Sequence, residues 1–216
     1  MNNRLYEVFV ADTEFAKTIN YHVRYQVYCE QKQYESPCDE FIDQERDEWD
    51  ERSVHFIVRD QLSGEWCAAL RLVKPVTGLQ LPLENISKIN EECIRGKRHQ
   101  AVELSRLCKP KSGSYESLGK RTDGEVIQAL VSSVARYCHD HGYDELFCLT
   151  SPSIVRLMPR RWKLNAVGPA AEHRGLRRPY WLDIDSILDF CDEKMPDVGY
   201  RNFSCAFGGN AMASVF

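Results

Sequence analysis

The spacing of apolar residues predicts a short strand followed by an amphipathic helix at the start of the chain. The strand covers residues 5–10, and Asp12 or Thr13 is a suitable N-cap for the helix. Apolar residues then recur at four-residue steps, as on one helix face: Phe15, Ile19, Val23 and Val27. Arg24 and Tyr28, also four apart, lie on a neighbouring stripe of this helix.

A long polar segment then leads to three predicted strands. Residues 30–52 show no clean periodicity and are expected to form a loop with one helical turn. Residues 53–60 and 65–73 are typical of a β-hairpin. After an irregular stretch with a helix expected at 84–92, the sequence VELSRLCK at 102–109 predicts a buried strand.

The second half of the chain alternates between helices and strands. Thr122 and Glu125 form a capping box, and the helix that follows ends near Gly142. Its apolar face comprises Val126, Ile127, Leu130, Val131, Val134, Ala135 and Cys138. The later elements, in order, are a strand at 145–150, a helix from Ser151 and Pro152 to about Arg161, strands at 163–168 and 177–184, and a short helix at 185–191.

This order of elements predicts an α+β fold with a mixed, mostly antiparallel central sheet flanked by helices. Strand 145–150 follows a crossover helix and is expected to run parallel to its neighbour, and a splayed pair at that join would form a cleft. We expect one domain over residues 1–195 and a weakly ordered tail over 196–216.

Composition excludes several classes of protein. The net charge of −4 argues against a nucleic-acid partner, and no apolar run approaches the roughly 20 residues that would cross a bilayer. The start of the chain lacks the apolar run of a secretory signal, so we expect a cytoplasmic protein without stable membrane insertion.

The cysteines indicate reduced thiols rather than disulfides, because all nine are scattered along the chain and their number is odd. Cys138, His139 and His141 have no second ligand pair at zinc-site spacing. We therefore expect no metal site, and interpret this group as the end of a helix.

Charge is distributed unevenly along the chain. Residues 30–52 hold ten acidic and three basic residues, whereas residues 156–178 hold seven basic residues and one acidic residue. Each run could be a solvated loop, which is the commoner case. The basic segment could also dock an acidic partner.

Two charged residues, Glu103 and Arg106, interrupt the predicted strand at 102–109. Side chains alternate along a strand, so Glu103 and Arg106 would face opposite ways unless a β-bulge between them shifts the parity. We predict such a bulge near 103–106. Its unpaired N–H could polarise a carbonyl group.

Buried charges survive when they neutralise one another. The candidate set, three cations and three anions, is Arg24, Asp47, Asp50, Arg71, Glu103 and Arg106. Two interpretations remain open: a structural network that orients the long loop, or a site in which Glu103 acts as a general base.

Five stretches in this order resemble the acyl-homoserine lactone (autoinducer) synthases and, more closely, the exosortase/PEP-CTERM-associated acyltransferases and long-chain N-acyl amino acid synthases. They are VRYQVYCE, DEWDERSVHFIV, GEWCAALRLVKP, VELSRLC and RRPYWLDI. The resemblance implies a GNAT-like fold with a V-shaped cleft and transfer of a long fatty acyl chain from an acyl carrier protein thioester to an amine. It implies no permanently bound cofactor, because the 4′-phosphopantetheine thioester is a co-substrate.

Carried over by motif, the resemblance implies catalytic roles for Glu103 and Arg106. It implies substrate binding by Arg24, Tyr28, Asp47, Asp50 and Arg71; we also expect Ser105 to bind substrate and Phe147 and Leu149 to lie beside the acyl chain. Together with Leu157 and Met158 they would line a tunnel, or simply belong to the core.

The loop after the strand, CKPKSGSYESLGKR, lacks the glycine spacing of a CoA pyrophosphate loop, which favours a carrier-protein donor. The candidate carrier and pantetheine contacts are Lys109, Lys111, Lys120, Arg121, Arg156 and Arg160. Tyr34 stands where autoinducer synthases have tryptophan, which favours an amino acid over S-adenosylmethionine as acceptor. The rival hypotheses are a true autoinducer synthase and a non-catalytic acyl-carrier sensor.

Overall fold

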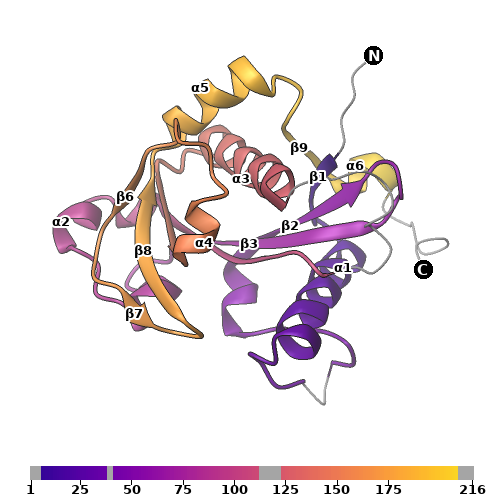
Figure 1. Cartoon of the computed structure of the whole chain (residues 1–216), viewed down its shortest axis with the longest axis horizontal. Helices are drawn as coiled ribbons and strands as arrows, with labels where there is room; N and C mark the ends of the chain where they lie inside the picture. The colour runs from indigo at the N-terminus through magenta and orange to yellow at the C-terminus, as the bar shows by residue number, and fades with distance from the viewer. Residues whose placement is uncertain (1–5, 38–40, 112–122, 209–216) are drawn as a thin grey trace.

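The computed structural model describes residues 6–37, 41–111 and 123–208, in which nine strands form a sheet flanked by helices (Figure 1). The strands are β1 (Tyr6–Val10), β2 (Ser53–Asp60), β3 (Trp66–Val73), β4 (Ala101–Cys108), β5 (Glu145–Thr150), β6 (Leu164–Ala166), β7 (Ala171–Glu172), β8 (Leu176–Leu182) and β9 (Tyr200–Asn202). The α-helices are α1 (Glu14–Tyr25), α2 (Glu91–Ile94), α3 (Asp123–Asp140), α4 (Pro152–Val155), α5 (Ile184–Lys194) and α6 (Phe203–Phe207). Shorter helical turns are the π-helix η1 (Gln26–Gln31) and the 3₁₀ turns η2 (Glu48–Arg52), η3 (Pro82–Asn85) and η4 (Arg98–Gln100).

The sheet has the strand order β6-β8-β5-β4-β3-β2-β1-β9, with β7 paired to β8. Its central strands are antiparallel, while β5 runs parallel to β4 and β9 parallel to β1. The predicted mixed, mostly antiparallel sheet, including the parallel β4–β5 pair, is therefore confirmed.

The strands β4 and β5 separate before either of them ends. Their register runs from Ala101↔Glu145 to Leu104↔Cys148, although β4 continues to Cys108 and β5 to Thr150. Figure 1 shows the consequence, because β2 and β3 run across the view while β8, on the other side of this join, runs from top to bottom. This is the predicted splay.

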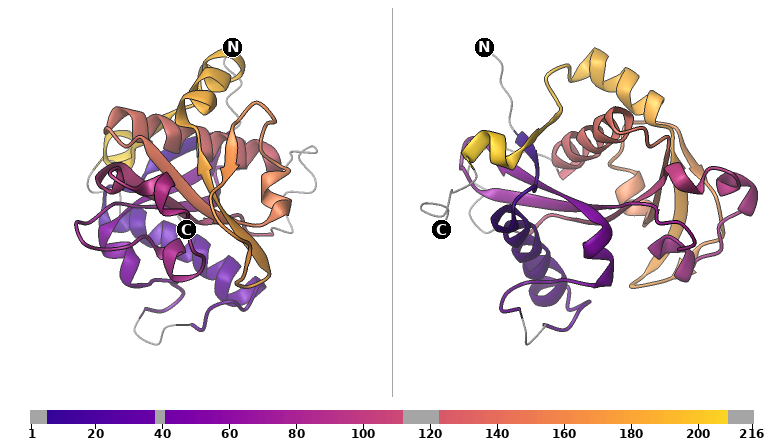
Figure 2. Two further views of the ribbon diagram at one scale, coloured as in Figure 1. Left: turned by 90° about the vertical axis from the view of Figure 1, so that its left-hand side faces the viewer. Right: turned by 180° about the vertical axis from the view of Figure 1, so that it is seen from behind.

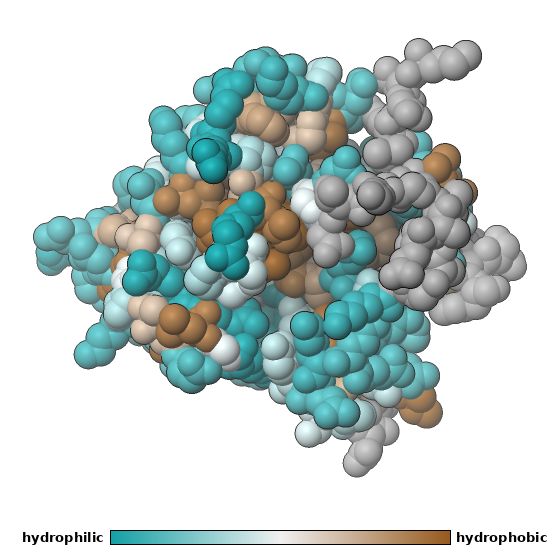
Figure 3. Space-filling view, in the orientation of Figure 1, coloured by the Kyte–Doolittle hydropathy of each residue, from teal (hydrophilic) through white to brown (hydrophobic). Residues whose placement is uncertain are grey.

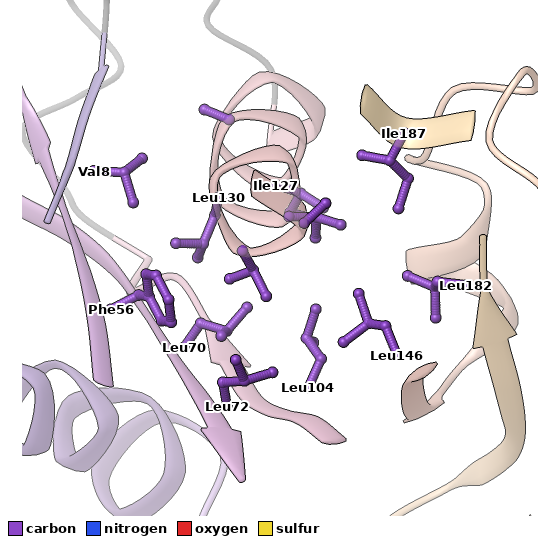
Figure 4. Close-up of a cluster of buried hydrophobic side chains, with 14 of the residues drawn as sticks. Val8, Phe56, Leu70, Leu72, Leu104, Ile127, Leu130, Leu146, Leu182 and Ile187 are labelled. Atoms are coloured by element: carbon purple, nitrogen blue, oxygen red, sulfur yellow. The ribbon is translucent and has the colours of Figure 1, made fainter. Parts of the chain in front are cut away.

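The two faces of the sheet bury separate cores. α3 and α5 cover one face and α1 covers the other (Figure 2). On the α3 side, apolar side chains from both halves of the sheet converge beneath the helix, among them Phe56, Leu70, Leu104 and Leu146 (Figure 4). Ile19, Val23 and Val27 pack on the α1 side, as their helical spacing predicts.

The predicted bulge lies in β4 at Arg106 and Leu107. Ser105 pairs with Arg71 and Cys108 with Ala69, so two residues of β4 oppose one residue of β3. Arg106 adopts the left-handed conformation with φ of 52°. The shift in parity brings Arg106 to the face that Glu103 and Ser105 already occupy, while Leu107 packs on the α3 side.

Two predicted helices differ in the structure. The helix expected at 84–92 is two short turns, η3 and α2, because Pro82 begins the first and Asn90 caps the second. The helix from Pro152 ends at Val155 rather than near Arg161, since Pro159 has no N–H to continue it. The capping box at Thr122 lies outside the described residues.

The segment after Pro196, expected to be weakly ordered, forms β9 and α6. β9 pairs with β1, and Phe203 of α6 is buried among Phe9, Phe15 and Trp66. Aromatic burial therefore holds this segment through Phe207.

No helix in the described part of the chain is long and apolar enough to cross a membrane. The eight cysteines within the described ranges are free thiols.

Candidate functional site

The centre of the site is Arg24, a fully buried arginine on α1. Its Nη1 and Nη2 donate to the two oxygens of Asp50 at 2.7 and 3.0 Å, and its Nε donates to Glu45 at 2.5 Å. A guanidinium group that donates on two sides in this way is fixed in orientation. Arg24 therefore ties the long acidic segment to α1.

Two further arginines, from β3 and β4, complete the inner network. Arg71 donates to Asp47, to Asp50 at 3.0 Å and to the hydroxyl of Ser105 at 3.1 Å. Arg106 donates to Asp47 at 2.8 Å and forms an ion pair with Glu45 at 2.9 Å. The bulge makes the second set possible, because it turns Arg106 toward α1.

The network extends to the other half of the sheet through Glu35. Arg106 donates to Glu35 at 2.9 Å, and Arg174, in the turn between β7 and β8, donates to the same carboxylate oxygen. β7 and β8 belong to the half that begins with β5. One carboxylate thus links the two halves at the level of the splay.

Local structure holds the acidic residues in place. Asp47 and Asp50 form a capping box around η2, in which Asp47 accepts from the N–H of Trp49 at 3.0 Å and Asp50 accepts from that of Asp47 at 2.9 Å. Burial alone would raise the pKa of Asp50, but its hydrogen bonds to Arg24 and the charge of Arg71 hold that pKa far below its usual range. Asp50 is therefore ionised.

Glu103 does not take part in this network, contrary to the prediction that it balances one of the three arginines. Its side chain is buried, with 3% of the residue exposed, and its Oε2 accepts from the backbone N–H of Leu83 at 2.8 Å. Among the described residues it has no ion pair within 4.0 Å. Glu45 instead fills the place in the network that the sequence analysis expected Glu103 to fill.

Burial raises the pKa of Glu103 to about 8, against the opposing effects of the Leu83 hydrogen bond and the Arg71 charge. The nearby carboxylate of Glu84 also raises it. Glu84 is itself paired with Arg98 at 2.9 and 3.0 Å and accepts from Leu81, which braces the turn that carries Leu83. A carboxyl group with a pKa near neutrality can exchange a proton with a substrate.

Tyr28 lies beside the bulge, where the π-helix η1 brings it. Its hydroxyl donates to the carbonyl of Leu107 at 3.2 Å, and the guanidinium of Arg106 lies 5.4 Å from its ring centroid. Burial raises the pKa of Tyr28 well above its usual range, so the hydroxyl remains a donor. Tyr28 and Arg24 reach one site, as their shared stripe predicts.

The four apolar residues expected to line a tunnel lie on two faces of the sheet. Phe147 and Leu149 pack in a small cluster with Leu81, Leu83 and Trp181. Leu157 and Met158 instead pack on the α3 side. The two pairs belong to different clusters, so all four do not line one tunnel.

The candidate carrier contacts are only partly described. Lys111 is exposed, and Gln31 accepts from its N–H at 2.9 Å and donates to its carbonyl at 3.3 Å. Lys109 is partly exposed, and Arg156 and Arg160 are exposed around and beyond the end of α4. Lys120 and Arg121 lie outside the described residues.

No group of three or more His, Cys, Asp or Glu residues in the described segments is arranged to hold a metal ion. The acidic residues near the site are instead bonded to arginines, as the contacts above show.

Three residues of the network were not foreseen: Glu35, Glu45 and Arg174. Glu45 lies two residues before Asp47 in an extended segment, so their side chains reach the same side. That spacing was a usable signal. Nothing local distinguishes Glu35 or Arg174, because their contact spans 139 residues of sequence.

Residues 23–111 match the family described as acetyltransferase (GNAT) domain. The match runs from the last turn of α1 through β4 and therefore includes Arg24, Asp50, Arg71, Glu103 and Arg106. No curated protein sequence matches the chain.

Several solved structures share the fold. The acyl-homoserine lactone synthase LasI is 20% identical with a TM-score of 0.60, and the match covers 83% of this chain and 89% of LasI. BjaI, a CoA-dependent acyl-homoserine lactone synthase solved with SAM and isopentyl-CoA, is 17% identical with a TM-score of 0.64, covering 92% and 93% of the two chains. FeeM, an N-acyl amino acid synthase from uncultured soil microbes, is 12% identical with a TM-score of 0.60, covering 84% and 92%.

These comparisons confirm the predicted GNAT-like fold, and the domain match over residues 23–111 is to a family of acetyltransferases.

Proposed function

We propose that this acyltransferase moves a long-chain fatty acyl group from a thioester to the amino group of an amino acid or similar small amine. The observation that carries the proposal is Glu103, a buried carboxyl group with a pKa of about 8 at the point where β4 and β5 separate. Its neighbours Arg71 and Arg106 are held by acidic residues rather than by Glu103, which leaves its carboxyl free to titrate.

The chemistry requires little of the protein because a thioester is already activated. The amine nitrogen attacks the thioester carbonyl, a C–N bond forms and the C–S bond breaks. Glu103 takes the proton that the nitrogen loses, and the departing thiolate takes it back as a thiol. The backbone N–H of the bulge is the proposed donor to the carbonyl oxygen as it becomes negative.

The proposed donor is an acyl carrier protein rather than CoA. The absence of a CoA-type glycine spacing after β4 supports this donor. Exposed Arg156 and Arg160, together with Lys109 and Lys111, provide basic groups for an acidic carrier and its phosphate. Apolar surface gathers near the middle of the face in Figure 3, where Figure 1 shows α4. The acyl chain is proposed to pack against this surface.

The neighbours allow two types of acceptor. BjaI was solved with SAM, and FeeM is an N-acyl amino acid synthase. We favour an amino acid because Tyr34, an exposed residue, stands where the autoinducer synthases that this sequence resembles have tryptophan. A place in an exosortase/PEP-CTERM system remains part of the proposal, and rests on sequence resemblance alone.

The test is acyl transfer in vitro. Purified protein is incubated with palmitoyl-loaded carrier protein or palmitoyl-CoA and either pooled amino acids or S-adenosylmethionine, and the products are identified by mass spectrometry. We expect N-palmitoyl amino acids, formed faster with the carrier. A homoserine lactone would favour the autoinducer alternative, and carrier binding without any product would favour the non-catalytic sensor.

A further inference from the structure

Arg52, at the end of η2, differs from the arginines of the network. Its Nη2 donates to the carbonyl of Gln80 at 2.6 Å, and its guanidinium lies 4.6 Å from the ring centroid of Trp49. Its Nη1 is buried and has no hydrogen-bond partner. A buried donor without an acceptor costs about 1–3 kcal/mol, so this group is poised for one.

Arg52 and Glu103 lie under the same short segment. Gln80 accepts from Arg52, while Leu83, three residues later, donates to Glu103. The sheet register agrees, because Ser53 pairs with Val73 and Val73 pairs with Glu103 in one row across β2, β3 and β4. The two side chains are also close enough to interact electrostatically when Glu103 is ionised.

The network leaves Arg52 uncompensated. Its four arginines, Arg24, Arg71, Arg106 and Arg174, meet four carboxylates, Glu35, Glu45, Asp47 and Asp50. Arg52 forms no ion pair with a described residue, and the nearby Glu103 carboxyl is neutral for most molecules at pH 7. A guanidinium group with an uncompensated charge and an unused N–H donor is suited to bind a carboxylate.

We propose that Arg52 binds the carboxylate of the acceptor through Nη1, so that the acceptor is an amino acid held with its amine toward Glu103. This inference rests on the proposed function and specifies its substrate class. Arg52 would be a substrate-binding residue that sets specificity for acceptors with a free carboxylate.

The experiment compares amino acids with their carboxamides as acceptors, using palmitoyl-loaded carrier as donor. The ratio of kcat/KM for the acid to that for the amide is measured in wild type, Arg52→Gln and Arg95→Gln. Arg95 is an exposed arginine just after α2, so its variant is a control for lost charge. We expect the ratio to fall about tenfold to a hundredfold in Arg52→Gln, the range for a lost charge-assisted hydrogen bond, and to stay unchanged in Arg95→Gln.

A binding measurement separates this inference from the proposed function. N-palmitoylglycine and N-palmitoylglycinamide are titrated into each protein by calorimetry. If no amide forms with any amine, yet Arg52→Gln loses the preference for the acid, the function fails and the carboxylate site stands. If amides form and neither ratio changes in Arg52→Gln, the carboxylate site is wrong and the function stands.

Folding of each variant is checked by circular dichroism. Should Arg52→Gln fail to fold, Arg52→Lys replaces it, because lysine keeps the charge but cannot serve both the Gln80 carbonyl and a carboxylate in a fixed fork. A several-fold fall in the acid-to-amide ratio is expected for Arg52→Lys, and an unchanged ratio would overturn the proposal.

Discussion

The backbone N–H of Leu83 donates to Oε2 of Glu103 over 2.8 Å, and this hydrogen bond joins the turn after β3 to the strand that carries the site. It stabilises the ionised form of Glu103, yet burial outweighs it and the pKa rises to about 8. The hydrogen bond and the raised pKa together fix where Glu103 points and when it carries a charge.

Activity is expected to rise with pH up to about 8. If Glu103 is the base, kcat/KM should increase about tenfold per pH unit below its pKa of about 8 and level off above it. A hydrazide acceptor, whose nitrogen is unprotonated throughout this range, removes the titration of the amine. A pH profile that is flat between 6 and 9 with the hydrazide would contradict the role of Glu103.

Glu103→Gln should keep the fold and lose about a hundredfold or more of kcat, the usual contribution of a general base. Glutamine preserves the size of the side chain and can still accept from Leu83. Steady-state kinetics and circular dichroism provide the measurement, with Glu92→Gln, a change at an exposed position on α2, as control. Wild-type rates in Glu103→Gln would remove Glu103 from the mechanism.

Folding stability should decrease as pH rises through the range between the ordinary pKa of a glutamate and about 8. The folded state retains a proton on Glu103 that the unfolded state has lost, so each step up in pH favours unfolding. The stabilisation is complete below the unfolded pKa and lost above the folded one. Urea titrations at several pH values should show this slope in wild type and a smaller one in Glu103→Gln.

Arg24→Met should destabilise the protein by about 3–5 kcal/mol, because it leaves Glu45 and Asp50 buried without their main partner. Lys17→Met removes the exposed pair with Glu14 and should change stability by less than about 1 kcal/mol. Denaturant midpoints of the two variants give the comparison. Equal small losses would show that the Arg24 network does not hold the acidic segment.

Phe203→Ala should cost about 3–5 kcal/mol, the usual range for removal of a buried phenylalanine side chain. Phe203 is 1% exposed, whereas Leu62, which is 63% exposed, supplies the control variant Leu62→Ala. Thermal melts would detect the difference. A loss no larger than that of Leu62→Ala would mean that α6 contributes little to the fold.

Most of the fold could be predicted from the sequence because its long helices and strands have strong hydrophobic patterns. The faces of α1 and α3 and the hairpin of β2 and β3 follow from local spacing. β9 and α6 were missed because they are short, and their stability comes from pairing with β1 and packing on Phe9, which lie far away in the sequence. Short elements of this kind have no local signal strong enough to reveal them.

The candidate site was predicted in part for a related reason. A glutamate and an arginine three apart in a buried strand conflict with simple alternation, and that conflict indicated the bulge at Arg106. The partner of each charge could not be predicted, because residues 30–52 offer ten acids and only the tertiary fold selects Glu35 and Glu45. Arg52 was overlooked because an unused donor is visible only once every neighbour is known.

The last β4–β5 pair, Leu104↔Cys148, places a native thiol where it can report local opening of the structure. Cys148 is 1% exposed in the core under α3, and burial raises the pKa of its thiol to about 12, so an alkylating reagent reacts with it only when that core opens. The exposed thiol of Cys205 supplies the unprotected reference rate in the same molecule. The ratio of the two labelling rates would thus measure how often the core between α3 and the last β4–β5 pair opens, with no engineered probe.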